Sequence, residues 1–186
     1  MIHGKYLGQG ADLADVKKIR NAVFGGSGYD THEELDAMAV NVIADCDEEN
    51  ISANTEKNDR NSDNDDRMQK VDSEKILLTN KGCSIENGKC CEKYNVAAGR
   101  LVLDLENDRF YVDNICVLEE FRAKKYGEFV LRMLADKASQ CRAEFIWADV
   151  SGSDAKGFFE KMLFEEYEGD LMRAEIKKFQ GCCHGC

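Results

Sequence analysis

The chain has 186 residues and a formal net charge of −11, with 43% hydrophobic and 33% charged side chains. This length fits one domain with a sizeable core, and the acidic balance argues against nucleic acid as the main partner, because phosphate binding needs a basic surface. No apolar run approaches the ~20 residues that cross a bilayer, and the first residues lack an apolar signal core, so we expect a cytoplasmic protein without a membrane partner.

The first part of the chain predicts one helix and one strand. Asp12–Phe24 is predicted to be helical, with Asp12 as a plausible N-cap and an apolar stripe at helical spacing formed by Leu13, Val16, Ile19 and Val23. Gly25–Gly28 ends this helix. The apolar run Met38–Ala44 predicts a strand.

The composition changes at residue 45. Residues 45–75 carry eleven acidic and five basic side chains, so −6 of the total charge lies there, and large apolar residues are sparse. Such a segment buries too little surface to offset its ordering entropy, and we interpret it as a mobile acidic loop. We therefore predict one domain over residues 1–186, with an acidic, cysteine-containing insert at about 45–95.

Regular structure is predicted again from Val96 onward. The order is strand, strand, helix, strand, helix, strand, over Ala98–Leu105, Arg109–Leu118, Gly127–Cys141, Glu144–Val150, Asp154–Met162 and Glu168–Lys177. The first two strands form a probable hairpin, and a strand–helix–strand unit implies a parallel crossover. The predicted fold class is therefore α/β (α+β), a mixed sheet with helices on its faces.

A basic loop joins the strand Arg109–Leu118 to the following helix. Arg122, Lys124 and Lys125 stand in this loop, and Gly127 opens the helix. Backbone N–H groups and the positive end of a helix dipole converge at such a point, which favours a phosphate. The alternative is an ordinary strand-to-helix connection with solvated lysines.

The residues around this loop resemble the GNAT superfamily of acyl-CoA-dependent N-acetyltransferases. Its signature is Arg/Gln-x-x-Gly-x-Gly/Ala after a strand that ends in a pattern like Asn-Ile-x-Val. Asn114–Val117 matches the strand end, Arg122 and Gly127 match the first and last signature positions, and Lys125 replaces the middle glycine.

The resemblance continues in the run after the next strand, where family members carry Asn-x-x-Ala-x-x-Phe-Tyr-x-Lys-x-Gly-Phe. Ala155, Phe158, Lys161 and Phe164 match this run, whereas Gly152, Phe159 and Leu163 differ. The resemblance covers most of the chain except residues 45–95 and the tail after Lys178.

The resemblance implies a mostly antiparallel sheet in which two strands splay apart around acetyl-CoA or another acyl-CoA. The predicted cofactor-binding residues are Ile115, Cys116, Val117, Arg122, Ala123, Lys124, Lys125, Tyr126, Gly127 and Glu128. The implied reaction moves an acyl group to a primary amine of a small molecule or peptide, and an oligomer is possible. The alternative function is a catalytically weak module that binds or senses CoA.

Aminolysis of a thioester needs a base for the ammonium proton and an acid for the leaving thiolate. Asp113 is the first candidate base, with Glu119 or Asp149 acting through water as alternatives. The family's usual acid is a tyrosine at the position of Phe159, which cannot donate a proton. We therefore predict Tyr111, two residues from Asp113 and on the same face of the strand, as a catalytic residue; Ser151 or Ser153 is the other option.

Two further groups of residues leave alternatives open. Glu33, Glu34 and Asp36 suit a cationic amine, but equally an ordinary solvated loop. Cys116 is interpreted as a small buried residue rather than a nucleophile. Cys183 and Cys186 have metal-ligand spacing, and Cys90–Cys91 offers more thiolates, so zinc or another metal is possible, although a frayed tail fits as well.

Overall fold

The computed structural model describes the backbone of residues 2–47, 81–86, 89–151 and 153–180, and the side chains of residues 2–46, 94–151 and 155–179. The insert between residues 48 and 80 and the cysteine tail 181–186 lie outside the described residues. Within the described residues no helix is both long and apolar enough to cross a bilayer.

The sheet has eight strands in the order β1-β2-β4-β5-β6-β8-β7, with β3 paired to β4. The strands are β1 (His3–Leu7), β2 (Val40–Asp47), β3 (Lys81–Glu86), β4 (Lys89–Asp104), β5 (Arg109–Val117), β6 (Phe145–Asp149), β7 (Glu165–Glu168) and β8 (Leu171–Glu175). Every pairing is antiparallel except that of β5 with β6. This confirms the predicted mixed, mostly antiparallel sheet, and the crossover helix α4 (Tyr126–Gln140) explains its one parallel pair.

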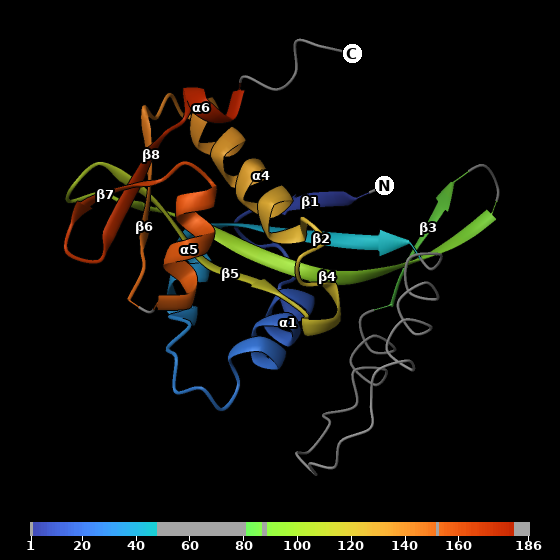
Figure 1. The fold of residues 1–186 in the computed structure, drawn as a ribbon. Helices are drawn as coiled ribbons and strands as arrows, with labels where there is room; N and C mark the ends of the chain where they lie inside the picture. Colours follow the sequence, from blue (N-terminus) through green and yellow to red (C-terminus); the bar gives the residue numbers. More distant parts are fainter. Residues whose placement is uncertain (1, 48–80, 87–88, 152, 181–186) are drawn as a thin grey trace, which may run out of the picture.

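Helices cover both faces of the sheet, as Figure 1 shows for α4 above the strands and α1 (Ala14–Phe24) below them. α1 buries Val16 and Ile19, and α4 buries an apolar stripe that includes Val130 and Leu134. The short helix η1 (Glu33–Met38) contacts β4. The helix α6 (Lys177–Gln180) contacts α4, and α5 (Ser153–Lys161) contacts the start of α4 through Phe158 and Gly127. We call the two sides the α1 face and the α4 face.

Adjacent residues of β4 show how different the two faces are. Gly99 points to the α4 face, where an added Cβ would lie 2.6 Å from Val130 Cγ1. Arg100 points to the α1 face and is fully buried there. The α4 face is therefore closely packed and apolar at this position, whereas the α1 face holds a charge.

Several predicted boundaries need correction. The last strand, predicted over Glu168–Lys177, is wrong as a single strand: β7 and β8 form a hairpin, and Gly169, with φ 58°, lies in the turn between them. Lys177 starts α6 instead of ending a strand. The edge strand β1 was missed, because its sequence has no alternation of apolar and polar residues.

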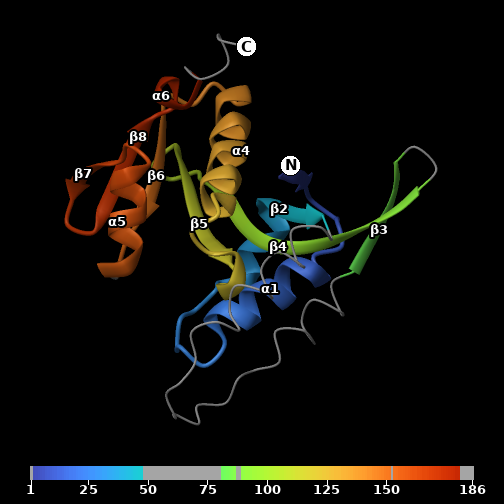
Figure 2. The same ribbon diagram turned by 45° about the vertical axis from the view of Figure 1, so that its right-hand side comes forward.

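Paired strands also enter both ends of the region predicted to be an insert. β2 extends to Asp47, and β3 pairs with the first part of β4, where Cys91 lies opposite Ser84. This hairpin extends away from the helices in both views (Figures 1 and 2). Tyr94 and Asn95, predicted to lie in the insert, are buried in β4.

Candidate active site

β5 and β6 pair only at their first residues and then separate. Their register consists of Phe110 opposite Ile146 and Tyr111 opposite Trp147. From Val112 to Val117, β5 has no partner in β6 among the described residues, although β4 pairs with its other edge. The β6 side of this segment therefore offers backbone N–H and C=O groups to an extended ligand. Ile115, Cys116 and Val117, predicted to bind the cofactor, lie in this segment.

A bulge at Asn114 lies within the same segment. Arg100 is opposite Asp113 and Ala98 is opposite Cys116, so β5 has one more residue than β4 between these pairs. Asn114 has φ 51°, a conformation that asparagine tolerates, and its amide donates to the Thr31 carbonyl at 2.8 Å. The bulge puts Asp113 on the α1 face and Ile115 on the α4 face, next to Gly99.

The loop between β5 and α4 has two left-handed residues in a row of three. Ala123 has φ 60° and Lys125 has φ 68°, and α4 begins directly afterwards. Lys125 thus has a conformation in which glycine is favoured, and glycine is the residue that the family's signature has at this position. Successive N–H groups in such a loop, followed by a helix N-terminus, make a concavity that suits phosphate oxygens.

Two buried aromatic rings anchor the ends of this loop. Phe121 and Tyr126 pack edge to face with centroids 5.8 Å apart, and both are at most 5% exposed. The side chain of Tyr126 is therefore part of the core, and only its backbone is suited to contact a ligand. Gly127 packs against Phe158 and Val117, since an added Cβ would lie 3.4 Å and 3.5 Å from their nearest atoms.

The predicted cations lie on the exposed side of the loop. Arg122 Nε donates to the Val117 carbonyl at 3.4 Å, and Lys124 Nζ donates to the Glu120 carbonyl at 2.7 Å. Glu128, in the first turn of α4, accepts two hydrogen bonds from Arg132 one turn later. Glu128 is therefore paired within α4.

A network of buried charges occupies the α1 face behind β5. Arg100 donates to both carboxylate oxygens of Asp113, at 2.8 Å and 2.6 Å, and to Asp36 at 3.0 Å. Arg20 of α1 donates to both oxygens of Asp36, at 2.9 Å and 2.8 Å, and to Asn41 at 2.5 Å. Both arginines have 0% exposure, so the two carboxylates neutralise them inside the protein.

The network shifts the pKa values of its members. Burial by itself would raise the pKa of Asp36, but the hydrogen bonds and charges of Arg20 and Arg100 outweigh it and hold this pKa below 3.8. Burial opposes the charged form of Arg100 as well, yet Asp113 and Asp36 raise its pKa overall. Asp36 and Arg100 therefore stay ionised together at neutral pH.

Arg100 also fixes the loop that follows α1. Its guanidinium donates to the carbonyl oxygens of Thr31 at 3.0 Å and His32 at 2.8 Å. Tyr29, in the same loop, stacks on Phe24 and is 48% exposed. Burial raises the pKa of Tyr29, and the carboxylates of Asp113 and Asp149 raise it further. Asp113 and Asp149 border β5 and β6 where these strands part, so Tyr29 lies within electrostatic range of that point; the sequence had not singled it out.

The two predicted catalytic residues, Asp113 and Tyr111, have different surroundings. Both oxygens of Asp113 accept hydrogen bonds from Arg100, and its side chain is 27% exposed. Asp149 is exposed, and one of its oxygens accepts the N–H of Ser151 at 3.1 Å. Tyr111 lies two residues from Asp113 on an unbroken register, opposite Trp147 where β5 and β6 still pair. Tyr111 therefore lies before the bulge and before the point where the strands part.

Phe159, at the family's tyrosine position, is part of an aromatic cluster. It is 6% exposed and its ring lies 4.9 Å from that of Phe164 and 5.2 Å from that of Phe158. Leu163 follows α5 with φ 67°, where the family's run has glycine, and the N–H of Phe164 closes the helix on the Phe159 carbonyl. Phe159 and Leu163 are two of the three positions at which this chain differs from the family's run; the third, Gly152, lies outside the described residues.

The remaining predicted groups have structural partners or lie outside the described side chains. Burial raises the pKa of Cys116 to about 12, so this thiol stays protonated, as expected of a packing residue. Glu33 pairs with Lys17, and Glu34 lies 3.3 Å from His32. Within the part of the chain that the structure describes, no three His, Cys, Asp or Glu side chains cluster as metal ligands would; the tail cysteines and the side chains of Cys90 and Cys91 lie outside it.

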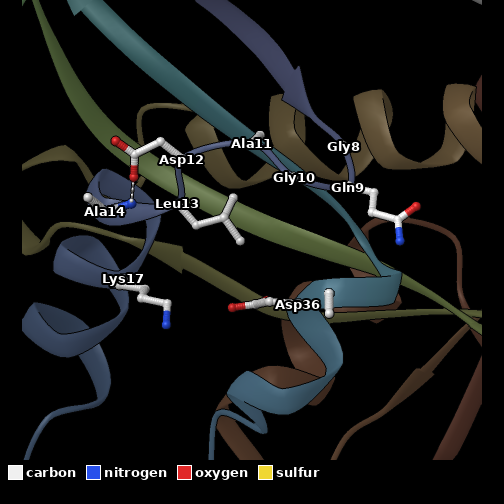
Figure 3. A pocket seen from close by; sticks show the side chains of 10 residues that line it. Gly8, Gln9, Gly10, Ala11, Asp12, Leu13, Ala14, Lys17 and Asp36 are labelled. Atoms are coloured by element: carbon white, nitrogen blue, oxygen red, sulfur yellow. Dashed lines mark hydrogen bonds between the residues drawn. The ribbon is translucent and has the colours of Figure 1, made fainter.

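One cavity lies away from the separated strands. Figure 3 shows it between the loop Gly8–Leu13 and η1, with Lys17 and Asp36 also on its wall, and its volume is about 600 Å³. The carboxylate of Asp12 accepts the N–H of Ala14 at 2.9 Å and so occupies the N-terminus of α1. Asp36 is already paired with two arginines and Lys17 with Glu33, so among the described residues no buried polar side chain on the wall of this cavity lacks a partner.

An open parallel pair of strands, a left-handed loop and a helix N-terminus define the class: a fold that holds an extended, phosphorylated cosubstrate between two strands. Residues 46–164, more than half of the chain, match the profile of the Acetyltransferase (GNAT) family, and the chain belongs to this family. No curated protein matches the chain.

Solved structures agree on the fold. The chain is similar to the ribosomal-protein-S18-alanine N-acetyltransferase of Escherichia coli, with 14% identity over 95% of this chain and 94% of that one and a TM-score of 0.54. It is also similar to a GNAT family acetyltransferase of Brucella melitensis solved with acetyl-CoA (11% identity, 94% and 88% coverage, TM-score 0.53). Escherichia coli ElaA is a third (11% identity, 93% and 97% coverage, TM-score 0.52).

Proposed function

We propose that this protein transfers an acyl group, in the first place acetyl, from acyl-CoA to a primary amine. The observation that carries the proposal is the unpaired edge of β5 from Val112 to Val117, which leads directly into the left-handed loop and α4. An extended pantetheine chain would pair with this edge while the pyrophosphate meets the N–H groups of the loop. The Brucella structure with acetyl-CoA is consistent with this role for the fold.

The chemistry requires that the amine nitrogen attack the thioester carbon while the carbon–sulfur bond breaks. Asp149 is the proton acceptor we favour, directly or through water, because it is exposed and Arg100 already engages both oxygens of Asp113. Asp113 then acts by holding a negative charge beside the ammonium group. A carboxylate pair of this kind also favours a cationic acceptor before it is deprotonated.

Tyr29 is the proton donor that we propose for the departing thiolate. The charges of Asp113 and Asp149 act on Tyr29 in the region where the strands part, and its raised pKa keeps the hydroxyl protonated at neutral pH. Phe159 has no proton to give, and Tyr111 lies where β5 still pairs with β6. A thiol has an ordinary pKa of ~8.5, so loss of this donor would slow the release of CoA rather than abolish it.

The test combines binding and turnover. Titration calorimetry with acetyl-CoA should show binding, and the double change Arg122→Ala, Lys124→Ala should weaken it roughly thirtyfold, because each of the two charge-assisted contacts to phosphate contributes ~1 kcal/mol or more. Lys137→Ala, at the far end of α4, is the matched control and should leave affinity unchanged. Acetyl-CoA with a panel of amines should then release free thiol, which a chromogenic disulfide reports.

Two results would contradict the proposal. If the double variant binds acetyl-CoA as tightly as the unchanged protein, the pyrophosphate lies elsewhere. If acetyl-CoA binds but no amine, peptide or small, releases thiol above the rate without acceptor, the chain is a CoA-binding module instead. Tyr29→Phe and Asp149→Asn separate the assigned roles, since each should lower kcat while acetyl-CoA affinity stays the same.

A further inference from the structure

One side of the sheet next to the separated strands carries arginines and aromatic rings together. Arg109 starts β5, Phe145 and Trp147 lie in β6, Tyr167 lies in β7 and Arg173 lies in β8. We call these five residues the arginine–aromatic face. Arg109 lies over the Trp147 ring with its Cζ 4.2 Å from the centroid, and Tyr167 meets the same ring edge to face at 5.0 Å.

This face is on the same side of the sheet as the two carboxylates. Arg109, Tyr111 and Asp113 alternate along β5 without a bulge, so they share the α1 face, and Trp147 and Asp149 do so in β6. The opposite side of β6 and β8 carries the buried residues Ile146, Met172 and Ala174. α1 packs on β4 and β5, which leaves the arginine–aromatic face beyond its reach.

The two guanidinium groups have no carboxylate partner in the described part of the chain. Arg173 stacks on Tyr167 at 4.7 Å and on Phe145 at 4.8 Å, so the rings cover its flat side and leave its N–H edge for a ligand. Acidic side chains lie near both arginines: Asp104 is opposite Arg109 and accepts from Asn107, Glu165 is opposite Arg173 and pairs with Lys178, and Glu175 is two residues from Arg173 and pairs with Lys177. Because each of these carboxylates has another partner, the guanidinium N–H groups of the two arginines are the donors that the face offers to a ligand, on a protein of net charge −11.

We propose that the arginine–aromatic face binds an acidic side chain of a peptide acceptor whose amine lies at Asp113 and Asp149. This inference rests on the proposed acyl transfer. Arg109 and Asp113 are four residues apart in β5, so the anion and the amine would be separated by about 13 Å, or about four residues of extended peptide. The amine and carboxylate of a free amino acid are too close together to reach both ends.

The shape of the surface favours a peptide over a small metabolite. Sites for small molecules are usually concave, and the cavity that the described residues form beside η1 lies elsewhere. Tyr167 is 47% exposed on the arginine–aromatic face, which provides an open, flat contact. Only two cations are present, and the protein is acidic overall, which favours an acidic peptide over a nucleic acid.

The experiment uses eight-residue peptides with a free N-terminal amine and blocked C-terminus, in which positions four and five are Glu-Glu, Gln-Gln or Lys-Lys. Thiol release from acetyl-CoA gives kcat and KM, and fluorescence anisotropy of labelled copies gives affinity without turnover. The unchanged protein should prefer the Glu-Glu peptide over the Gln-Gln peptide about tenfold in kcat/KM, through KM, as expected for one or two charge-assisted contacts.

Substitutions test whether the arginine–aromatic face causes the preference for the Glu-Glu peptide. Arg173→Gln and Arg109→Gln should each remove most of the preference while leaving the Gln-Gln peptide and acetyl-CoA affinity unchanged, and Arg173→Lys should restore part of it. Lys137→Gln on α4 removes the same charge far from the face and should change nothing. Thermal unfolding of each variant checks that the fold persists.

The outcomes separate this inference from the proposed function. Thiol release with equal kcat/KM for the Glu-Glu and Gln-Gln peptides overturns the inference alone, as does an Arg173→Gln variant that weakens every peptide equally. Anisotropy that favours the Glu-Glu peptide in an arginine-dependent way supports the face even if no thiol is released, in which case the proposed function fails. Tighter binding of a labelled oligonucleotide than of the Glu-Glu peptide would also overturn the inference.

Discussion

The two faces of the central sheet differ in what forms their candidate sites: backbone conformation on one face and buried charged side chains on the other. On the α4 face, the predicted grip for acyl-CoA depends on backbone conformation: an unpaired strand edge, two left-handed residues and a helix N-terminus. On the α1 face, the candidate acceptor side depends on side chains, with Arg20 and Arg100 buried against Asp36 and Asp113. Backbone geometry tolerates substitution, as Lys125 and Leu163 demonstrate at glycine positions, whereas a buried ion network requires particular residues.

The largest expected effect comes from removing Arg100. The change Arg100→Met should lower the free energy of unfolding by about 3–5 kcal/mol, because Asp36 and Asp113 would remain buried or half-buried without their shared partner. Urea denaturation followed by Trp147 fluorescence measures it. A loss of unfolding free energy below ~1 kcal/mol would mean that solvent reaches the charged network. The α1 face would then not depend on buried ion pairs, and it would no longer differ from the α4 face in this way.

Protonation of Asp36 at low pH should destabilise the same network by less than the removal of Arg100 does. Asp36 has a lower pKa in the folded protein than its ordinary 3.8, so its contribution to stability is complete above that value and is lost as the pH falls through the folded pKa. The stability difference between the unchanged protein and Asp36→Asn should therefore be constant from pH 7 to pH 5 and narrow below about pH 3.8. A difference that narrows already between pH 7 and pH 5 would contradict the lowered pKa.

The neighbouring residue tests the apolar face. Gly99→Ala places a Cβ 2.6 Å from Val130 Cγ1 and 3.2 Å from Leu134 Cδ1, and we expect a loss of about 1–3 kcal/mol from overpacking. Gly8→Ala is the control, since an added Cβ there meets nothing within 4 Å. Equal stability of the two variants in urea would show that α4 can shift away from β4 at no cost.

The smallest effect should be a gain. Leu163 is 56% exposed and left-handed, so Leu163→Gly should raise the free energy of unfolding by about 0.5–1 kcal/mol, after the entropy of the unfolded glycine is counted. Leu163→Ala keeps a Cβ and should give no gain. If both variants lose stability equally, the Leu163 side chain contributes contacts that its exposure does not indicate.

The strongly patterned segments were predictable from sequence. Val16 and Ile19 marked α1, and the apolar run before Asp149 marked β6, because each was dense enough in buried side chains to define its element. The hairpin of β7 and β8 was not predictable, since β7 is exposed throughout and has no alternation. The family resemblance located the loop at Arg122, but not the left-handed state of Lys125, which tertiary packing imposes against the residue's preference.

The sequence indicates only weakly that Arg20 and Arg100 are buried. Arg100 stands in the middle of an otherwise apolar strand, which signals a buried charge, but its partners are 13 and 64 residues away. Sequence reasoning took Asp36 and Asp113 as candidates for the acceptor amine or the base, because a carboxylate looks the same whether solvent or an arginine faces it. Tyr29 was missed for a similar reason: only the folded loop brings it within electrostatic range of Asp149.

The bulge at Asn114 also sets a rule for grafting between relatives. Because it adds one residue to β5 after Asp113, everything from Ile115 onward lies on the opposite side from where uninterrupted alternation would put it. Deleting Asn114 alone would let Ile115 follow Asp113 in regular alternation and stay on the α4 face, whereas a chimera that adds or loses one residue of β5 after Asn114 would move the residues beyond that point to the opposite face. Donor segments should therefore be joined before Val112 or after Val117, so that the whole bulged segment comes from one protein.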